Sequence, residues 1–210
     1  MGPSPMEIPD RRHYSQEDQY SWLSILLDSY AICDEGIEQE IAREEEERGA
    51  KVACAKGCFA CCLHYDVPVS APEFMGLAWY ASEMLEPDVR ERLRQRFANQ
   101  ALTVGCPFLL DGACSVYPLR PLACREFVVY KTPCLEDEDP YFSRPEDMHP
   151  ANPGRKLKTA LRFLDSPLYG LATEENKLAA IKKGVMHKNI PGMHEIEWGL
   201  IIENMSSVLA

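Results

Sequence analysis

The distribution of nine cysteines along 210 residues constrains this chain more than any other feature of its sequence. One group lies within residues 54–62, and a second, more widely spaced group lies within residues 106–134. Cys33 stands apart from both groups. Packing alone does not require two such dense groups of thiols, so we expect them to act together. The clustered residues are Cys54, Cys58, Cys61, Cys62, Cys106, Cys114, Cys124 and Cys134.

The cysteine pattern favours metal ligands over disulfide bonds. The total number of cysteines in the chain is nine, which is odd, and residues 1–7 show neither the basic nor the apolar segment of a secretory signal. We therefore expect a cytoplasmic protein in a reducing environment, where disulfides are rare. Thiolate sulfur binds zinc and iron–sulfur clusters well, and spacers of two or three residues let neighbouring thiols converge on one centre. All eight clustered cysteines are therefore predicted metal ligands.

Local features of the first group refine this prediction. Gly57 precedes Cys58 and permits the tight backbone of a metal-binding knuckle. Successive side chains diverge in extended structure, so the adjacent Cys61 and Cys62 are not expected to reach one ion easily. They would serve two metals, two irons of one cluster, or one metal and one redox partner. His64 is a further candidate, because imidazole is an ordinary zinc ligand.

The second group begins in a predicted β-hairpin. Residues 106–117 read as two short strands joined by a turn at Asp111-Gly112. This hairpin would bring Cys106 and Cys114 close together, opposite the first group of cysteines. The two halves of one metal site would then come from distant parts of the chain.

Arg120 and Arg125 flank Cys124 in a segment stiffened by prolines. Guanidinium groups there would donate hydrogen bonds to cluster sulfurs or bind a small anionic substrate, so both arginines are predicted to bind the cofactor. The alternative is a structural ion pair with Glu126 or with the acidic stretch at 135–140. The residues alone leave both interpretations open.

Several separate motifs, taken in order, resemble the YkgJ-type cysteine-cluster family. They are Cys54-x3-Cys58-x2-Cys61-Cys62, Cys-Pro-Phe-Leu at 106–109, Gly112-x-Cys114-x-Val-Tyr, and Arg120-Pro121-x-x-Cys124-Arg125. The resemblance covers about residues 50–135 and implies a zinc- or iron-chelating domain. Bacterial flagellin lysine methylases, which are similar more remotely, are described as carrying an iron–sulfur cluster. This link, the number of thiolates and the adjacent cysteine pair favour an iron–sulfur cofactor, more specifically 4Fe–4S, with zinc as the alternative.

Other motifs fit the sequence less well. The three-cysteine spacing that begins at Cys54 matches that of radical S-adenosylmethionine enzymes. Those enzymes continue with repeated βα units, whereas this chain continues with predicted helices and a hairpin. His194 begins a motif like that of zincin proteases, but Trp198 stands where the second histidine is required. No phosphate-binding loop or nucleophile elbow is present.

Three roles remain open for such a protein. It is a cytoplasmic protein holding one metal centre, a metal-dependent redox or protein methyltransferase-like enzyme, or a structural zinc module for protein interaction. No general base is identifiable, so the sequence does not decide whether it is an enzyme. Beyond the metal centre, the predicted partner is a protein or a small anionic substrate. A net charge of −11 argues against nucleic acid, and no apolar run approaches the roughly 20 residues that span a membrane.

The hydrophobic pattern predicts a mainly α fold with a small hairpin and a loop-rich metal-binding core. We expect a flexible tail over 1–14, a cysteine-cluster domain over 15–140 and a helical C-terminal extension over 141–210. The domain opens with a long helix that ends near Gly49. Cys33 falls on its apolar stripe, which favours a buried small side chain over a ligand.

Two further helices are predicted between the cysteine groups. Ser70 and Glu73 form a capping box that opens the first, and Pro87 opens the second. The arginines between 90 and 96 are expected to form a solvated face. Both helices are expected to pack over the metal centre. The C-terminal third contains no cysteine, so we assign it to packing or to partner binding.

Overall fold

The fold of the computed structural model is mainly α-helical, with one small antiparallel hairpin, over the residues that it describes. These residues are 6–100, 104–188 and 190–208. The predicted fold class is confirmed. The longer helices are α1 (Ser21–Arg48), α3 (Ala71–Trp79), α4 (Pro87–Ala98), α7 (Pro153–Phe163), α8 (Glu174–Lys182) and α9 (Trp198–Val208). The shorter elements are α2 (Ala60–His64), α5 (Leu122–Glu126), α6 (Pro140–Ser143), β1 (Leu109–Leu110) and β2 (Ala113–Cys114).

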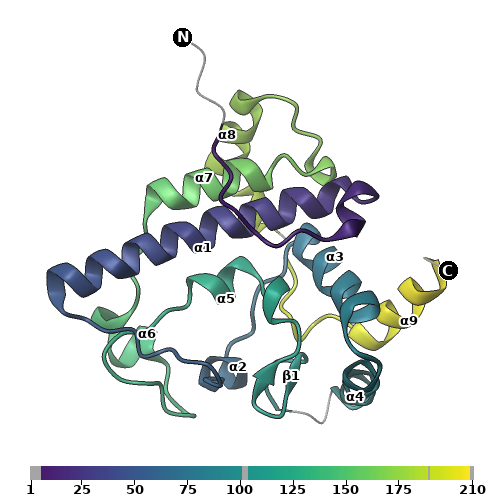
Figure 1. The fold of residues 1–210 in the computed structure, drawn as a ribbon, viewed down its shortest axis with the longest axis horizontal. Coiled ribbons are helices and arrows are strands. Elements are labelled where there is room, and N and C mark those ends of the chain that lie inside the picture. The colour runs from purple at the N-terminus through teal and green to yellow at the C-terminus, as the bar shows by residue number, and fades with distance from the viewer. Residues whose placement is uncertain (1–5, 101–103, 189, 209–210) are drawn as a thin grey trace.

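Helix α1 crosses the whole molecule and organises the other elements (Figure 1). A separate 3-10 turn, Ser15–Asp18, precedes it, so the first helical signal in the sequence marks this turn rather than the start of α1. The helix ends at Gly49, whose φ of 62° is the left-handed conformation expected of a glycine at this position. Cys33 lies on the inner face of α1 with no exposed surface, as predicted.

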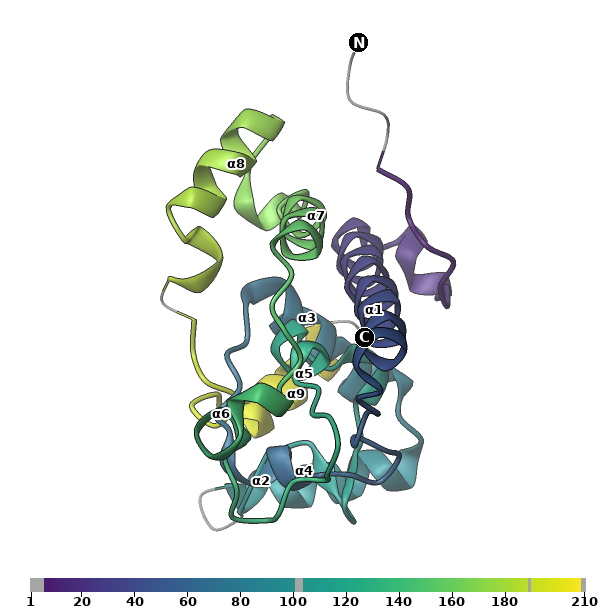
Figure 2. The same ribbon diagram turned by 90° about the vertical axis from the view of Figure 1, so that its left-hand side faces the viewer.

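The helices are arranged in layers around α1. Helix α7 runs along one side of α1, and α8 lies beyond it (Figures 1 and 2). The cysteine-bearing loops, α2 and the hairpin lie on the other side of α1 (Figure 1). At the far end, α3, α4 and α9 pack together, and the rings of Phe108 and Trp198 meet there at a centroid distance of 4.6 Å. The hairpin is therefore tied directly to the apolar core.

The predicted hairpin is present. Leu109 pairs with Cys114 and Leu110 with Ala113. Asp111 and Gly112 have φ angles of 49° and 74°, as a two-residue hairpin turn of this type requires. This tight turn is a local property of the sequence, which explains why it was predictable.

The N-terminal segment is partly anchored to α1. Arg11 forms ion pairs with Glu17 at 2.7 Å and with Asp28 at 2.6 Å. Tyr14 is buried in the core. Residues 1–5 of the expected tail lie outside the described residues, and the domain boundaries stay predictions. Among the helices that the structure describes, none has the length and apolar character needed to cross a membrane.

Candidate metal centre

Cys54 is held against the segment that follows α5. Val52 forms an isolated antiparallel bridge with Tyr130, and the Ala53 amide donates to the Val129 carbonyl at 2.8 Å. The Val129 amide donates in turn to Cys54 Sγ at 3.4 Å. A sulfur that accepts a backbone hydrogen bond is stabilised as a thiolate, which is the form that binds metals.

Cys61 and Cys62 lie on helix α2, not in extended structure. The interaction with the Cys62 side chain is the largest cause that raises the pKa of Cys61, followed by burial. The extended backbone assumed for this pair is therefore wrong, and the expectation that the two thiols do not reach one ion stays a prediction. The Cys62 carbonyl accepts a hydrogen bond from the Cys106 amide at 2.6 Å, which joins the two cysteine groups.

Gly105 makes this junction possible. Its φ of 81° is left-handed, and a Cβ atom at this position would lie 2.8 Å from the Cys62 carbonyl oxygen. Any other residue would therefore push α2 away from Cys106. The sequence analysis did not single out Gly105, although a glycine directly before a clustered cysteine was an available signal, as it was at Gly57.

Four cysteines form what we call the inner group: Cys61, Cys106, Cys114 and Cys124. Burial raises the pKa of the Cys106 thiol to about 12, and the nearby Cys114 adds to this rise. Burial also raises the pKa of Cys124, and its three inner-group neighbours raise it further. The pKa values of Cys106, Cys114 and Cys124 are each raised by at least one other of the four thiols, which supports the placement of all four in one region of the fold.

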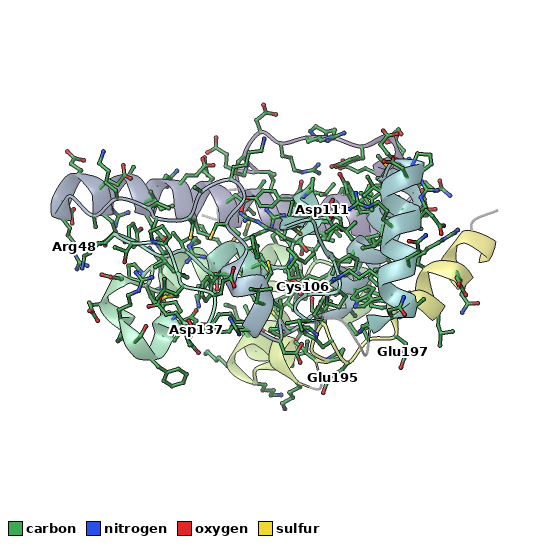
Figure 3. All side chains as sticks on the ribbon, turned by 90° about the horizontal axis from the view of Figure 1, so that it is seen from below. Arg48, Cys106, Asp111, Asp137, Glu195 and Glu197 are labelled. Atoms are coloured by element: carbon green, nitrogen blue, oxygen red, sulfur yellow. The ribbon has the colours of Figure 1, made fainter. Side chains whose placement is uncertain are left out.

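Three cysteines form the outer group: Cys54, Cys58 and Cys134. Cys54 and Cys58 are exposed, and Cys134 is partly buried. Burial raises the pKa of Cys134, and the neighbouring Cys54 and Cys58 contribute to the rise. Cys61 of the inner group also contributes to the raised pKa of Cys54, so the outer group borders the inner one. Figure 3 shows the labelled Cys106 of the inner group near the middle of the molecule.

Nowhere in the described ranges do three or more His, Cys, Asp or Glu side chains already stand in the geometry that holds a metal ion. The thiols are neighbours rather than a formed coordination shell. His64 is exposed at the end of α2. Burial is the largest cause of the raised pKa of Cys33, and the smaller influences come from charged groups of α5, α7 and α1.

Arg125 is almost fully occupied by structural contacts. Its Nε donates to the Arg120 carbonyl at 2.9 Å, and Nη2 donates to the Pro118 carbonyl at 2.6 Å. Nη1 pairs with Asp34 of α1, and the guanidinium lies 3.9 Å from the ring centroid of Tyr30. The structural partner is thus Asp34, and not Glu126 or the acidic stretch. These contacts fix α5, which carries Cys124, against α1.

Arg120 behaves differently. Its guanidinium stacks on the ring of Tyr117 at 4.2 Å, and its buried Nε has no hydrogen-bond partner among the residues described. The positive charge lies close enough to lower the pKa values of Cys54, Cys114 and Cys124, although burial raises each of them overall. A buried, unused donor beside several thiols fits a site that carries negative charge when the thiols ionise.

Two neighbouring helices support the loops of the site. Glu73, in the capping box of α3, accepts a hydrogen bond from the Leu122 amide at 2.8 Å. Arg96 of α4 donates to the carbonyls of Cys106 at 3.0 Å and Pro107 at 3.1 Å. The prediction of a wholly solvated basic face is therefore wrong for Arg96. Its long side chain reaches across to a loop whose position the sequence did not reveal.

The fold and the gathered thiols define a class: an α-helical protein in which two distant cysteine segments meet under one long helix. Residues 53–147, somewhat less than half of the chain, match the model of the CxxCxxCC family, which is described as a "putative zinc- or iron-chelating domain". This match confirms the resemblance seen in the motifs. The match includes all eight clustered cysteines. Neither a curated protein nor a solved structure matches this chain.

Proposed function

We propose that this is a cytoplasmic protein whose inner cysteine group holds one thiolate-bound centre, an iron–sulfur cluster of the 4Fe–4S type. The supporting observation is the placement of four mutually interacting, partly buried thiols beside Arg120, whose buried Nε lacks a partner in the described chain. Thiols with pKa values raised by burial stay protonated at neutral pH unless a cation stabilises the thiolate. A soft metal centre supplies that stabilisation.

The donor set supports this assignment on chemical grounds. Four thiolates are the ligand set of 4Fe–4S clusters and also of closed structural zinc sites. We assign Arg120 to hydrogen bonding with the metal-bound sulfurs. We assign Arg125, whose donors hold α5 in place, to positioning Cys124. Such surrounding contacts orient ligands and tune a metal site.

Cys62 and the outer group complete the eight cysteines that we propose as ligands, of which the cluster itself takes four at a time. Cys62 touches Cys61, and Cys54 borders both groups. Because Cys54 and Cys58 are exposed, they are suited to capture a metal and pass it inward. A structural zinc site is the second candidate, because four closed thiolate ligands are typical of it.

Metal and sulfide analysis tests this function directly. Protein purified without oxygen is expected to be brown, with about four iron and about four acid-labile sulfide ions per chain, because that is the composition of the cluster. Iron, zinc and sulfide are measured on the same sample, together with the visible absorption spectrum. A colourless protein with one zinc per chain and no labile sulfide would reject the iron–sulfur proposal in favour of zinc.

Arg120→Gln is expected to weaken metal binding by about 10- to 100-fold, the usual effect of losing an outer partner of a metal ligand. The fold should be unchanged, because this side chain makes only the Tyr117 stacking contact in the part of the chain described. Competition with a chelator measures the affinity, and circular dichroism monitors the fold. Arg94→Gln, an exposed arginine on α4, is the control and should bind normally. An unchanged affinity in Arg120→Gln would remove this arginine from the site.

A further inference from the structure

A cavity of about 510 Å³ lies between the cysteine-bearing part of the chain and the C-terminal helices. Its walls come mainly from α5, α7, the region after α8 and the start of α3. Its size is within the roughly 300–1,000 Å³ typical of small-molecule sites. Most of its surface is apolar, with contributions from Leu122, Ala160, Phe163, Ile181 and Met186.

Two polar residues stand in this apolar wall. Thr159 is 5% exposed, and its hydroxyl is buried without a hydrogen-bond partner in the described chain. Glu73 is also 5% exposed, and its carboxyl group accepts from the amides of Ser70 at 2.9 Å and Leu122 at 2.8 Å. Ser70 Oγ provides a third hydrogen bond at 2.5 Å. Buried hydroxyl groups are normally paired, so the unpaired Thr159 hydroxyl indicates a missing partner.

The charges around the cavity favour an uncharged occupant. Lys156 and Glu126 both line the cavity and pair with each other at 3.3 Å, so their charges largely cancel. Glu126 also forms an ion pair with Arg155 at 2.6 Å. The buried carboxyl of Glu73 disfavours an anion, and its three hydrogen bonds leave it little capacity to hold an ammonium group.

We propose that this cavity binds a small uncharged molecule, apolar over most of its surface, with one hydroxyl or amide group that pairs with Thr159. The proposal goes beyond metal binding and does not depend on it. It also gives the C-terminal helices a role, since α7 and the end of α8 form much of the wall. Leu122 and Ala123 line the cavity directly before Cys124, so an occupant would contact the helix that carries a predicted metal ligand.

Methyl NMR on the full-length, metal-loaded protein tests this site with hexan-1-ol as the probe. Hexanoate and hexylammonium serve as charged probes of the same length. Saturable shifts are expected at the Ile181 and Met186 methyl groups, with hexan-1-ol binding tightest. Ala160→Leu fills the cavity and should weaken binding at least tenfold. Ala179→Leu, on the exposed side of α8 and outside the cavity, should bind as the original protein does.

Thr159→Val keeps the shape of the side chain and removes the hydroxyl. It should weaken hexan-1-ol binding severalfold, and it tests the site even if Ala160→Leu does not fold. The absence of saturable shifts would overturn the proposal, as would equal binding to the original protein and to a folded Ala160→Leu variant. Tighter binding of either charged probe would overturn the uncharged class of ligand. Metal content, measured on each variant, should stay unchanged, which separates this test from that of the metal centre.

Discussion

Cys124→Ser is expected to abolish metal binding and to leave much of the cysteine-bearing region unfolded. Cys124 lies on the short helix α5, and the three other inner-group thiols contribute to the rise of its pKa. Metal ligation contributes about 10–16 kcal/mol in small zinc domains, whereas whole proteins are stable by only about 5–15 kcal/mol. The free energy lost with the metal is therefore comparable to the whole free energy of unfolding. Metal analysis and thermal unfolding followed by circular dichroism measure the two effects.

Cys33→Ser is the matched control. Cys33 is fully buried, whereas Cys124 is partly buried, and Cys33 lies on α1, outside the two cysteine groups. This variant should keep its full metal content and lose about 1–3 kcal/mol of stability, because it buries a hydroxyl group in the core. Cys58→Ser, in the exposed outer group, is also expected to lose metal, because it interrupts the proposed path by which metal reaches the inner group. Full metal content in the Cys124 and Cys58 variants would contradict the assignment of these residues as ligands.

Arg155→Met is expected to lower the free energy of unfolding by about 3–5 kcal/mol, because it leaves the buried Glu40 carboxylate without its guanidinium partner. Arg155 of α7 is buried, and its Nε lies 3.1 Å from Glu40 of α1. Its Nη1 lies 2.6 Å from Glu126 at the end of α5. The Glu40 carboxylate also contacts the buried His149 at 2.8 Å. One side chain thus joins three elements of the fold. Urea denaturation of the metal-loaded protein measures the effect.

An exposed ion pair provides the comparison for Arg155. Arg92 pairs with Asp111 at the hairpin turn, where both side chains are largely open to solvent. Arg92→Met should change the free energy of unfolding by less than about 1 kcal/mol. Similar losses in the two variants would show that burial does not set the contribution of Arg155. The double variant Arg155→Met/Glu40→Gln should lose less than the sum of its single changes, because the two groups interact directly.

Short-range features of this protein were predictable because they depend on neighbours in the sequence. The capping box of Ser70 and Glu73 opens α3 as expected. The turn at Asp111-Gly112 forms because these residue types accept left-handed backbone angles. Gly49 ends α1 for the same reason. In each case the interacting groups lie within a few residues, so no knowledge of the remaining chain was required.

The long-range contacts around the site could not be predicted in the same way. Arg96 was expected to be solvated but holds the loop at Cys106. The structural ion-pair partner of Arg125 was expected to be Glu126 or the acidic stretch, and it is instead Asp34, far away in the sequence. Long flexible side chains can reach many partners. The partner that such a side chain contacts depends on how the helices pack, and this packing cannot be derived from a single sequence.

The sequence by itself determined the helical class, the hairpin and the family of the cysteine-rich segment, because spacing, capping and turn residues are local patterns. Only the tertiary structure decided which thiols become neighbours. The meeting of the two groups depends on the close approach of Gly105 to the Cys62 carbonyl, a contact between distant segments. Likewise, the cavity between α5 and α7 exists only where two helices pack imperfectly. Such features join residues that are distant in the sequence, so they become visible only once the complete chain has folded.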